Sequence, residues 1–241
     1  MTTAAATSPG SAGPSVVMLP RAVSVLVVTA RPGQESELLG GLVYAFRRAG
    51  ATLSLLCLTR GEAAGSDASA RLEAIRPWEL QLAAAVLGIS EVAVGNFRDG
   101  KLHHYAAADL AGRIRRAIAQ HSPELVVVIA PEAGDKGDAA VARAAIAAAA
   151  RAGVPVLAHT RPDAPGTWTV NLGADTPTAR AIQRAAVAAH TSQSESLPRL
   201  MRRLDLLDGR EGLRWLLFPR PLPAQRHRNP WPLADAAAAA P

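Results

Sequence analysis

Apolar runs that alternate with helix-like segments constrain the fold of this chain more than any other feature. Five runs of six or seven residues are rich in Val, Leu and Ile, and most are followed by a longer segment with helical spacing. Runs of this length and composition are typical of strands buried on both faces of a parallel sheet. We therefore expect strands at 23–28, 52–58, 91–97, 124–130 and 154–159. The alternation predicts an α/β fold with a Rossmann-like, doubly wound, mostly parallel sheet and right-handed crossovers.

Helices are expected between these runs, at 35–48, 68–88, 107–120 and 138–152, with one more at 177–189. The segment 68–88 contains Pro77, which should bend or divide the helix because proline lacks the backbone donor of an internal turn. Two short apolar runs, Trp168–Leu172 and Leu213–Phe218, predict additional strands at an edge of the sheet.

A chain of 241 residues is expected to hold one domain, at 21–220, between two tails. Residues 1–20 are rich in Ala, Thr, Ser, Pro and Gly, and 221–241 is broken by prolines, so we expect both to be disordered. The sequence shows no signal peptide and no apolar stretch of bilayer length, so we expect a cytoplasmic protein. Cys57 is the only cysteine, which excludes an internal disulfide and a cysteine-based zinc cluster.

The charge of the chain permits an anionic partner but does not indicate nucleic acid. The formal net charge is +6, and such an excess of basic residues attracts anions. However, the arginines are scattered along the chain, and no basic run is interleaved with aromatic residues, as a nucleic-acid surface requires. We therefore expect no nucleic-acid partner.

Two loops mark the expected pocket. In doubly wound sheets, ligands bind outside the carboxyl ends of the strands. The stretch TARPGQES (29–36) follows the first expected strand, and PEAGDKGDAAV (131–141) follows the fourth. These loops should therefore meet at the same edge of the sheet and form its binding crevice.

Several short motifs between about residues 22 and 200 occur in the order seen in one enzyme family. They are ARPGQE (30–35), GG (40–41) with AG (49–50), LTRGEAAG (58–65), RPWELQLAAAVLGI (76–89), FRDGKL (97–102) and AAHTSQ (188–193). On these residues the chain resembles the PIG-L/LmbE-like family of zinc-dependent N-acetylglucosaminyl deacetylases. The resemblance implies the α/β fold of that family.

The residues that this family uses for chemistry are replaced here. Active members take as zinc ligands a His and an Asp of the first motif and a His of a later His-x-Asp-His motif; the other Asp of the first motif is the general base. By resemblance, Arg31 stands at the ligand His, Gly33 at the base and Gln34 at the ligand Asp. The later motif falls on 136–139, where both histidines are lost and only Asp138 is kept.

These replacements do not suit a catalytic zinc ion, which needs about three protein ligands and an open position for water. Arg31 stays protonated, Lys136 adds a second positive charge, and Gln34 is at best a weak neutral ligand. We therefore expect no metal and no cofactor. The sequence predicts a homologue that has lost ordinary hydrolysis and binds a polar or anionic small molecule, or a protein partner such as another copy of the chain or an active relative.

Two other functions stay open. One is a repurposed enzyme, for instance of a specialised biosynthetic pathway, that runs metal-independent chemistry with Arg31, Lys136, Asp138 and Asp99 as its polar groups. The other is a zinc deacetylase or amidase with rebuilt ligands, such as His159 or Asp138. The i,i+4 spacing of helical zinc motifs is absent from the histidines at 103, 104, 121, 159, 190 and 227.

Most candidate pocket residues also have a plain structural interpretation. Arg31 either replaces the charge of the metal, paired with Asp138 or holding an anion, or is a solvent-facing loop residue. Asp138 is either that partner or the N-cap of an Ala-rich helix. Arg76 and Asp99 match family positions that contact the polar substrate. Alternatively, Arg76 forms an i,i+3 surface pair with Glu79. Asp99 then forms a turn with residue 100.

Four histidines complete the set of candidates. His159 ends an expected strand and is a candidate to point into the pocket, although a lone histidine is more often a local hydrogen-bonding group. His190 belongs to AAHTSQ and is expected to serve helix packing and pocket shape. His103 and His104 are adjacent, so on a strand or an α-helix their side chains should diverge.

Overall fold

The computed structural model describes residues 18–63, 69–196 and 209–219, together with residues 198, 201, 202 and 204. The tails predicted at 1–20 and 221–241 lie outside these residues, apart from 18–20.

The strands form one seven-stranded sheet in the order β3-β2-β1-β4-β5-β7-β6. Their bounds are β1 (Ser24–Thr29), β2 (Thr52–Thr59), β3 (Glu91–Phe97), β4 (Leu125–Ile129), β5 (Val156–Thr160), β6 (Trp168–Asn171) and β7 (Arg210–Leu217). The first five strands pair in parallel, whereas β7 is antiparallel to both β5 and β6. The predicted α/β fold with a mostly parallel sheet is confirmed.

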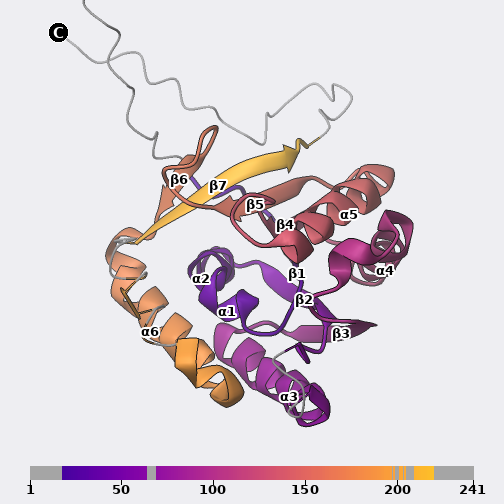
Figure 1. Ribbon diagram of the computed structural model, residues 1–241. Helices are drawn as coiled ribbons and strands as arrows, with labels where there is room; N and C mark the ends of the chain where they lie inside the picture. Colours follow the sequence, from indigo (N-terminus) through magenta and orange to yellow (C-terminus); the bar gives the residue numbers. More distant parts are fainter. Residues whose placement is uncertain are drawn as a thin grey trace, which may run out of the picture.

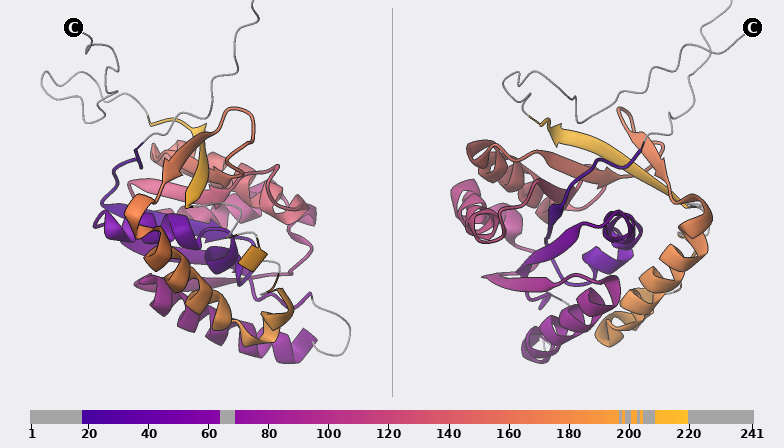
Figure 2. Two further views of the ribbon diagram at one scale, coloured as in Figure 1. Left: turned by 90° about the vertical axis from the view of Figure 1, so that its left-hand side faces the viewer. Right: turned by 180° about the vertical axis from the view of Figure 1, so that it is seen from behind.

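Helices cover both faces of this sheet (Figures 1 and 2). Their bounds are α1 (Gln34–Glu37), α2 (Gly40–Arg48), α3 (Ser69–Leu87), α4 (Ala107–His121), α5 (Lys136–Ala152) and α6 (Thr176–Ala188). One apolar core lies between the sheet and the helices α4 and α5, and a second lies between the sheet and α2, α3 and α6. The strands alternate their side chains between these two cores, which explains why their sequences are apolar throughout.

Two sequence predictions about elements need correction, and one of the two alternatives for Pro77 is excluded. The helix expected at 35–48 is split into α1 and α2, because the side-chain NH₂ of Gln183 binds the carbonyl oxygens of Ser36 (2.9 Å) and Glu37 (3.3 Å). These two carbonyl oxygens therefore have hydrogen-bond donors without the backbone N–H groups that a continuous helix would supply. Pro77 does not divide α3, which runs through it as one helix. The strand predicted at 213–218 is not at an edge, because β6 pairs on its outer side.

The order of the strands reverses between β1 and β4. The chain moves from β1 outward to β2 and β3, and then returns to place β4 on the other side of β1. At such a switch point the loops after the two central strands part and leave a crevice. The loops that follow β1 and β4 therefore form the candidate site. None of the described helices is long and apolar enough to cross a membrane.

Candidate functional site: a polar crevice after strands β1 and β4

The loop after β1 is closed by the first side chain of α1. The side-chain oxygen of Gln34 accepts hydrogen bonds from the backbone N–H groups of Ala30 (2.9 Å) and Arg31 (3.2 Å). Gly33 precedes the helix with a φ of 99°, a conformation that L side chains rarely adopt. The turn therefore depends on a glycine and is held by a buried amide.

The loop after β4 ends in a capping box at the start of α5. The Asp135 carboxylate accepts from the N–H groups of Gly137 (2.7 Å) and Asp138 (3.1 Å), and the Asp138 carboxylate accepts from the N–H of Asp135 (2.9 Å). Such reciprocal bonds satisfy the free donors of a first helical turn. The N-cap is thus Asp135, and Asp138, for which the N-cap was one of two interpretations, lies three residues later and completes the capping box. Lys136 is exposed as the first residue of the helix.

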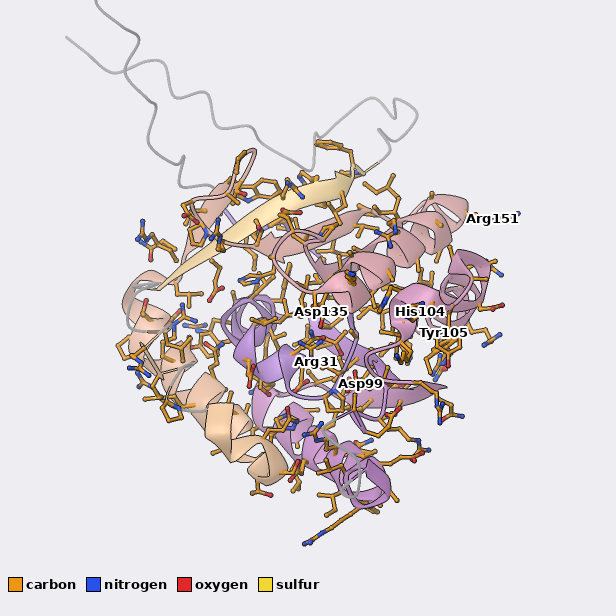
Figure 3. All side chains as sticks on the ribbon, in the orientation of Figure 1. Arg31, Asp99, His104, Tyr105, Asp135 and Arg151 are labelled. Atoms are coloured by element: carbon orange, nitrogen blue, oxygen red, sulfur yellow. The ribbon has the colours of Figure 1, made fainter. Side chains whose placement is uncertain are left out.

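Two side-chain bonds join the loops across the crevice. The Gln34 NH₂ donates to Asp138 Oδ1 at 2.7 Å, and Arg31 Nη1 donates to Asp135 Oδ2 at 2.7 Å. Gln34 and Asp138 are buried, whereas the side chains of Arg31 and Asp135 are 37% and 56% exposed. Figure 3 shows Arg31 and Asp135 pointing toward each other. Pairing with Asp138 was one of the interpretations of Arg31, but the partner in the structure is the outer carboxylate, Asp135.

The two carboxyl groups differ in their acidity. Burial raises the pKa of Asp138, and the hydrogen bond from Gln34 opposes this only in part. Burial also acts on Asp135, but the N–H of Asp138 and the positive charge of Arg31 outweigh it, so the pKa of Asp135 is lowered. For Arg31, burial is outweighed by the charges of Asp135 and Asp138, which raise its pKa. The outer pair is therefore ionic, while the inner carboxyl is easier to protonate.

Glu35 fastens the turn after β1 to the C-terminal end of α6. It is fully buried, and its carboxylate accepts from the N–H of Gly33 (2.9 Å) and the hydroxyl of Ser36 (2.7 Å). One oxygen of Glu35 lies 2.6 Å from His190 Nε2. His190 is buried just beyond α6. Glu35 thus links the turn after β1 to the segment after α6. His190 does not reach the crevice itself and affects the turn only through Glu35.

Arg76 and Glu79 on α3 bind other segments and do not form the surface pair considered above. Arg76 donates to the carbonyl of Gly61 and to the hydroxyl of Ser192 (3.3 Å), and burial lowers its pKa. Glu79 is buried and accepts from the hydroxyl of Thr191 (2.6 Å) and from the N–H (2.7 Å) and hydroxyl (2.6 Å) of Ser192. Both residues thus tie α3 to the segment after α6.

Asp99 forms the turn that was one of its two interpretations. Its carboxylate accepts from the N–H groups of Gly100 (2.8 Å) and Ala63 (3.4 Å). In addition, its negative charge helps to raise the pKa of Arg31 and partly opposes the lowering of the pKa of Arg76 by burial, which places it near both cations. Asp99 lies beside Arg31 at the crevice in Figure 3. The turn and the position at the pocket are therefore compatible.

His159 belongs to a separate buried network that the sequence did not predict. His159 Nε2 lies 2.8 Å from one oxygen of Glu211, and Arg180 Nη1 donates to the other at 2.7 Å. Arg180 also donates to the side-chain oxygen of Gln183 (2.7 Å), which in turn binds the carbonyl of Ser36. We call His159, Glu211, Arg180 and Gln183 the buried network. No motif identifies it, because its members lie on three separate parts of the sequence. The only signal is that they are polar residues in apolar surroundings.

The candidate metal ligands bind other side chains or stack on each other. Within the part of the chain that the structure describes, no three His, Cys, Asp or Glu side chains group as metal ligands would. His103 and His104 do not diverge as expected, because they lie in a short 3-10 helix (Leu102–His104), and their ring centroids are 4.0 Å apart. The proposed ligands His159 and Asp138 bind Glu211 and Gln34, respectively.

Comparisons with known proteins identify the family and the fold of the chain. The family model of GlcNAc-PI de-N-acetylase (PIG-L) matches residues 26–150, which include both loops of the crevice. A probable N-acetyl-alpha-D-glucosaminyl L-malate deacetylase 2 of Bacillus anthracis is 32% identical over 113 residues, which cover 44% of this chain and 50% of that protein. The match therefore spans about half the length of this relative.

Solved structures share the fold over most of the chain. GalB, the 4-carboxy-2-hydroxymuconate hydratase of Pseudomonas putida, has a TM-score of 0.65 at 20% identity and covers 84% of this chain and 99% of its own. The N,N'-diacetylchitobiose deacetylase of Pyrococcus horikoshii has a TM-score of 0.61 at 16% identity and covers 82% of this chain and 84% of its own. At these identities the similarity establishes the fold.

Proposed function

Because the chain belongs to the PIG-L family of de-N-acetylases, we propose that its crevice is a modified deacetylase site, which binds a polar or anionic small molecule and no longer runs zinc-dependent hydrolysis. The residues that form the crevice do not fit a zinc ion. The following contacts support this proposal.

The side chain of Gln34 is the observation that carries the proposal. Its oxygen accepts from two backbone N–H groups, and its NH₂ donates to Asp138. An amide NH₂ has no lone pair for a metal, and both acceptor sites of the oxygen are already used. Gln34 therefore bridges the two loops at the position where the family resemblance implies a ligand carboxylate.

The conformation of Gly33 supports the loss of the general base. Its φ of 99° strains any residue with a side chain, and a Cβ at this position would lie 2.9 Å from Gln193 Oε1. An aspartate at residue 33 would therefore need a different turn. The loop has a backbone conformation that suits glycine, so a base with a side chain at this position would be strained.

Exposed positive charge at the crevice is the reason that we propose a polar or anionic ligand. Arg31 keeps 37% of its side chain exposed beside Asp135, and Lys136 is exposed at the start of α5. A zinc ion next to this guanidinium would be repelled, whereas a carboxylate or a phosphate can bind it with charge-assisted hydrogen bonds. Arg31 thus supplies the positive charge that a metal supplies in active members of the family.

The zinc content of the purified protein tests the loss of the metal. After growth with zinc and without chelators, elemental mass spectrometry should find less than about a tenth of an equivalent, because catalytic zinc needs about three protein ligands. A variant with Arg31→His, Gln34→Asp, Lys136→His and Ala139→His restores the family pattern and serves as the positive control. We expect this variant to take up zinc. Near one equivalent in the wild type would overturn the proposal.

Ligand binding tests the role of Arg31. Isothermal titration with N-acetylglucosamine and with its L-malate glycoside compares a neutral with an anionic probe of the same sugar. We expect tighter binding of the glycoside and a loss of about tenfold or more with Arg31→Ala, because a charged hydrogen bond contributes about 1.5–3 kcal/mol. Arg214→Ala is the matched control, since Arg214 also binds a surface carboxylate and is 30% exposed. Equal affinities of the wild type, Arg31→Ala and Arg214→Ala for both sugars would contradict the proposed role of Arg31 in binding an anionic ligand.

A metal-independent enzyme is the second candidate, and two observations favour it. The fold of this chain also occurs in a protein named as a hydratase, so it supports chemistry other than deacetylation. In the crevice, burial raises the pKa of Asp138, as a general acid requires. This function predicts turnover that resists chelators and is lost in both Arg31→Ala and Asp138→Asn. Activity that survives both substitutions would exclude it.

A further inference from the structure

A second cavity, of about 700 Å³, lies at the N-terminal end of α6. Its lining includes Asn171, Ala174, Thr176, Pro177, Arg180 and Arg184. In Figure 1 this end of α6 lies near β6 and β7, whereas the other end, beyond which His190 contacts Glu35, lies near α3. The 13 residues of α6, with a rise of about 1.5 Å each, separate the two ends by roughly 20 Å. The cavity is therefore distinct from the crevice.

The guanidinium of Arg180 uses only one of its nitrogens to bind the protein. Its Nη1 donates to Glu211 Oε1 and to the side-chain oxygen of Gln183, both at 2.7 Å. Arg180 is 4% exposed, and its Nε and Nη2 are buried and have no hydrogen-bond partner among the described residues. These two nitrogens form one edge of the planar group, and such an edge binds an oxyanion with two parallel hydrogen bonds. Because buried donors without a partner are rare and costly, this edge points to a ligand.

We propose that the cavity binds the phosphate group of a small molecule, with Nε and Nη2 of Arg180 as its main donors. Arg180 and Arg184 are four residues apart on α6, so they share one side of the helix and lean toward its N-terminus. The positive end of the helix dipole favours an anion at the same place. A phosphate monoester carries about −1.5 to −2 charges at neutral pH and offers three acceptor oxygens. It therefore suits this arrangement better than a single carboxylate.

The acidic groups near the start of α6 leave the cavity open to an anion. Neither Asp nor Glu occurs in the described part of its lining. The first turn of α6 carries no acidic residue, and the side chain of the N-cap Asp175 makes no capping hydrogen bond. Asp175 Oδ2 lies 3.6 Å from Arg48 Nε instead. The positive end of α6 is therefore not capped by an acidic side chain.

The size and the remaining lining suit a small organic molecule that carries the phosphate. Pockets for small molecules commonly measure about 300–1,000 Å³. Ala174 and Pro177 add apolar surface, and the side-chain oxygen of Asn171 accepts from the N–H of Gly173 (2.9 Å), which orients its NH₂ group as a further donor. We therefore expect a phosphate monoester whose remaining part contacts the apolar side of the cavity.

Isothermal titration of the full chain with inorganic phosphate tests the site. The titrations use the Arg31→Ala background at constant ionic strength, so that anion binding at the crevice does not contribute. We expect a single phosphate per chain with a dissociation constant below about 1 mM. Acetate, which carries one charge, should bind at least about tenfold more weakly. The absence of phosphate binding, or equally tight binding of acetate, would overturn the proposal.

Two matched variants place the same negative charge inside and outside the cavity. Ala174→Glu adds a carboxylate to the lining, whereas Ala185→Glu adds it to the surface of α6 away from the described lining. Both alanines are exposed, so both variants should fold, which thermal unfolding checks. Phosphate binding should weaken at least about tenfold in Ala174→Glu and less than about twofold in Ala185→Glu, because repulsion falls with distance. Equal affinities of the two variants would exclude this cavity.

Arg180→Lys tests the assigned edge of the guanidinium. Lysine keeps a positive charge beside Glu211 but lacks the planar pair of donors. We expect phosphate binding to weaken at least about tenfold while acetate binding changes less, because the loss is specific to paired hydrogen bonds. Phosphate binding as tight as in the Arg31→Ala background alone would show that Arg180 is not the main donor and would overturn its assignment.

Discussion

The crevice and the buried network are both polar and both join segments far apart in the chain, yet they differ in exposure. The crevice has one ion pair open to solvent, Arg31–Asp135, above one buried pair, Gln34–Asp138. In the buried network, the side chains of Glu211 and Arg180 are only 2% and 5% exposed. Exposed ion pairs contribute little to stability, whereas breaking a buried one leaves an uncompensated charge in the core. The exposed residues of the crevice, Arg31 and Asp135, can therefore change at a smaller cost to the fold than the residues of the buried network.

This difference also explains how the site can change while its framework stays. Two buried side chains stabilise the turn after β1. Glu35 binds the N–H of Gly33 and contacts His190, and Gln183 binds the carbonyl of Ser36 in α1. These contacts do not involve Arg31 or Asp135. The framework is therefore stabilised by contacts separate from those at the mouth of the crevice.

Removal of Glu211 should have the largest effect on the fold. Glu211→Ala leaves Arg180 buried without its carboxylate, and two other nitrogens of Arg180 already have no hydrogen-bond partner. We expect the free energy of unfolding to fall by about 3–5 kcal/mol. Urea unfolding measures this change. Glu132→Ala, which breaks the half-exposed pair with Arg214, is the control and should cost less than about 1 kcal/mol. If Glu211→Ala and Glu132→Ala lowered the free energy of unfolding by similar amounts, the buried network would not be more important for stability than an exposed ion pair.

A methyl group added at Gly41 should disturb the buried network without removing any of its members. A Cβ there would lie 2.0 Å from Glu211 Oε1 and 2.6 Å from Arg180 Nη1, so the network must shift. We expect Gly41→Ala to destabilise the protein by about 1–3 kcal/mol. Gly112→Ala, in the interior of α4, is the control, because its nearest neighbour atom is 3.6 Å away. It should stabilise the protein by about 0.5–1 kcal/mol. Thermal unfolding of both variants checks the opposite signs.

Substitutions at the mouth of the crevice should have smaller effects. Asp135→Ala removes the N-cap of α5 and its bond to Arg31, and we expect the free energy of unfolding to fall by about 1 kcal/mol. Arg31→Ala removes only the exposed pair and should cost less than about 1 kcal/mol. Urea unfolding at neutral pH compares the two. If Arg31→Ala lowered the free energy of unfolding more than Asp135→Ala, the Arg31–Asp135 ion pair and not the N-cap of α5 would stabilise this loop.

The pH dependence of stability should have opposite signs in the two regions. Burial raises the pKa of Glu211, but its bond to His159 and the charge of Arg180 outweigh burial, so the pKa lies below its ordinary 4.5. The stabilisation by Glu211 is therefore complete above pH 4.5 and is lost as the pH falls through the lower folded-state value. Burial places the pKa of Asp138 above its ordinary 3.8, so its contribution is complete below pH 3.8 and is lost as the pH rises through the higher folded-state value.

Two variants separate these contributions. Glu211→Gln should flatten the rise of the unfolding free energy with pH, and Asp138→Asn should steepen it. Urea unfolding from about pH 3 to about pH 7 measures both slopes. A change of slope in the same direction for both variants would contradict the assignment of one of the two pKa shifts.

Much of the fold was predictable from the sequence, because strands and helices follow local patterns. The apolar runs at 23–28 and 91–97 became β1 and β3 within one residue of their predicted bounds. The position of the crevice followed from the alternation of strands and helices, and its two loops do meet after β1 and β4. The break between α1 and α2 was not predictable, because it depends on Gln183, which lies 147 residues from Ser36.

The sequence by itself determined the α/β fold, the family and the identity of the residues at the crevice. It did so because apolar periodicity, turn residues and short motifs are local properties of the chain. Only the tertiary structure decided that Arg31 binds Asp135, that Gln34 binds Asp138 and that His159 binds Glu211. These partners are 104, 104 and 52 residues apart, so they meet only when the crossovers bring β1 beside β4 and β5 beside β7. Local interactions can place a polar residue at the end of a strand, but the packing of distant segments selects its partner.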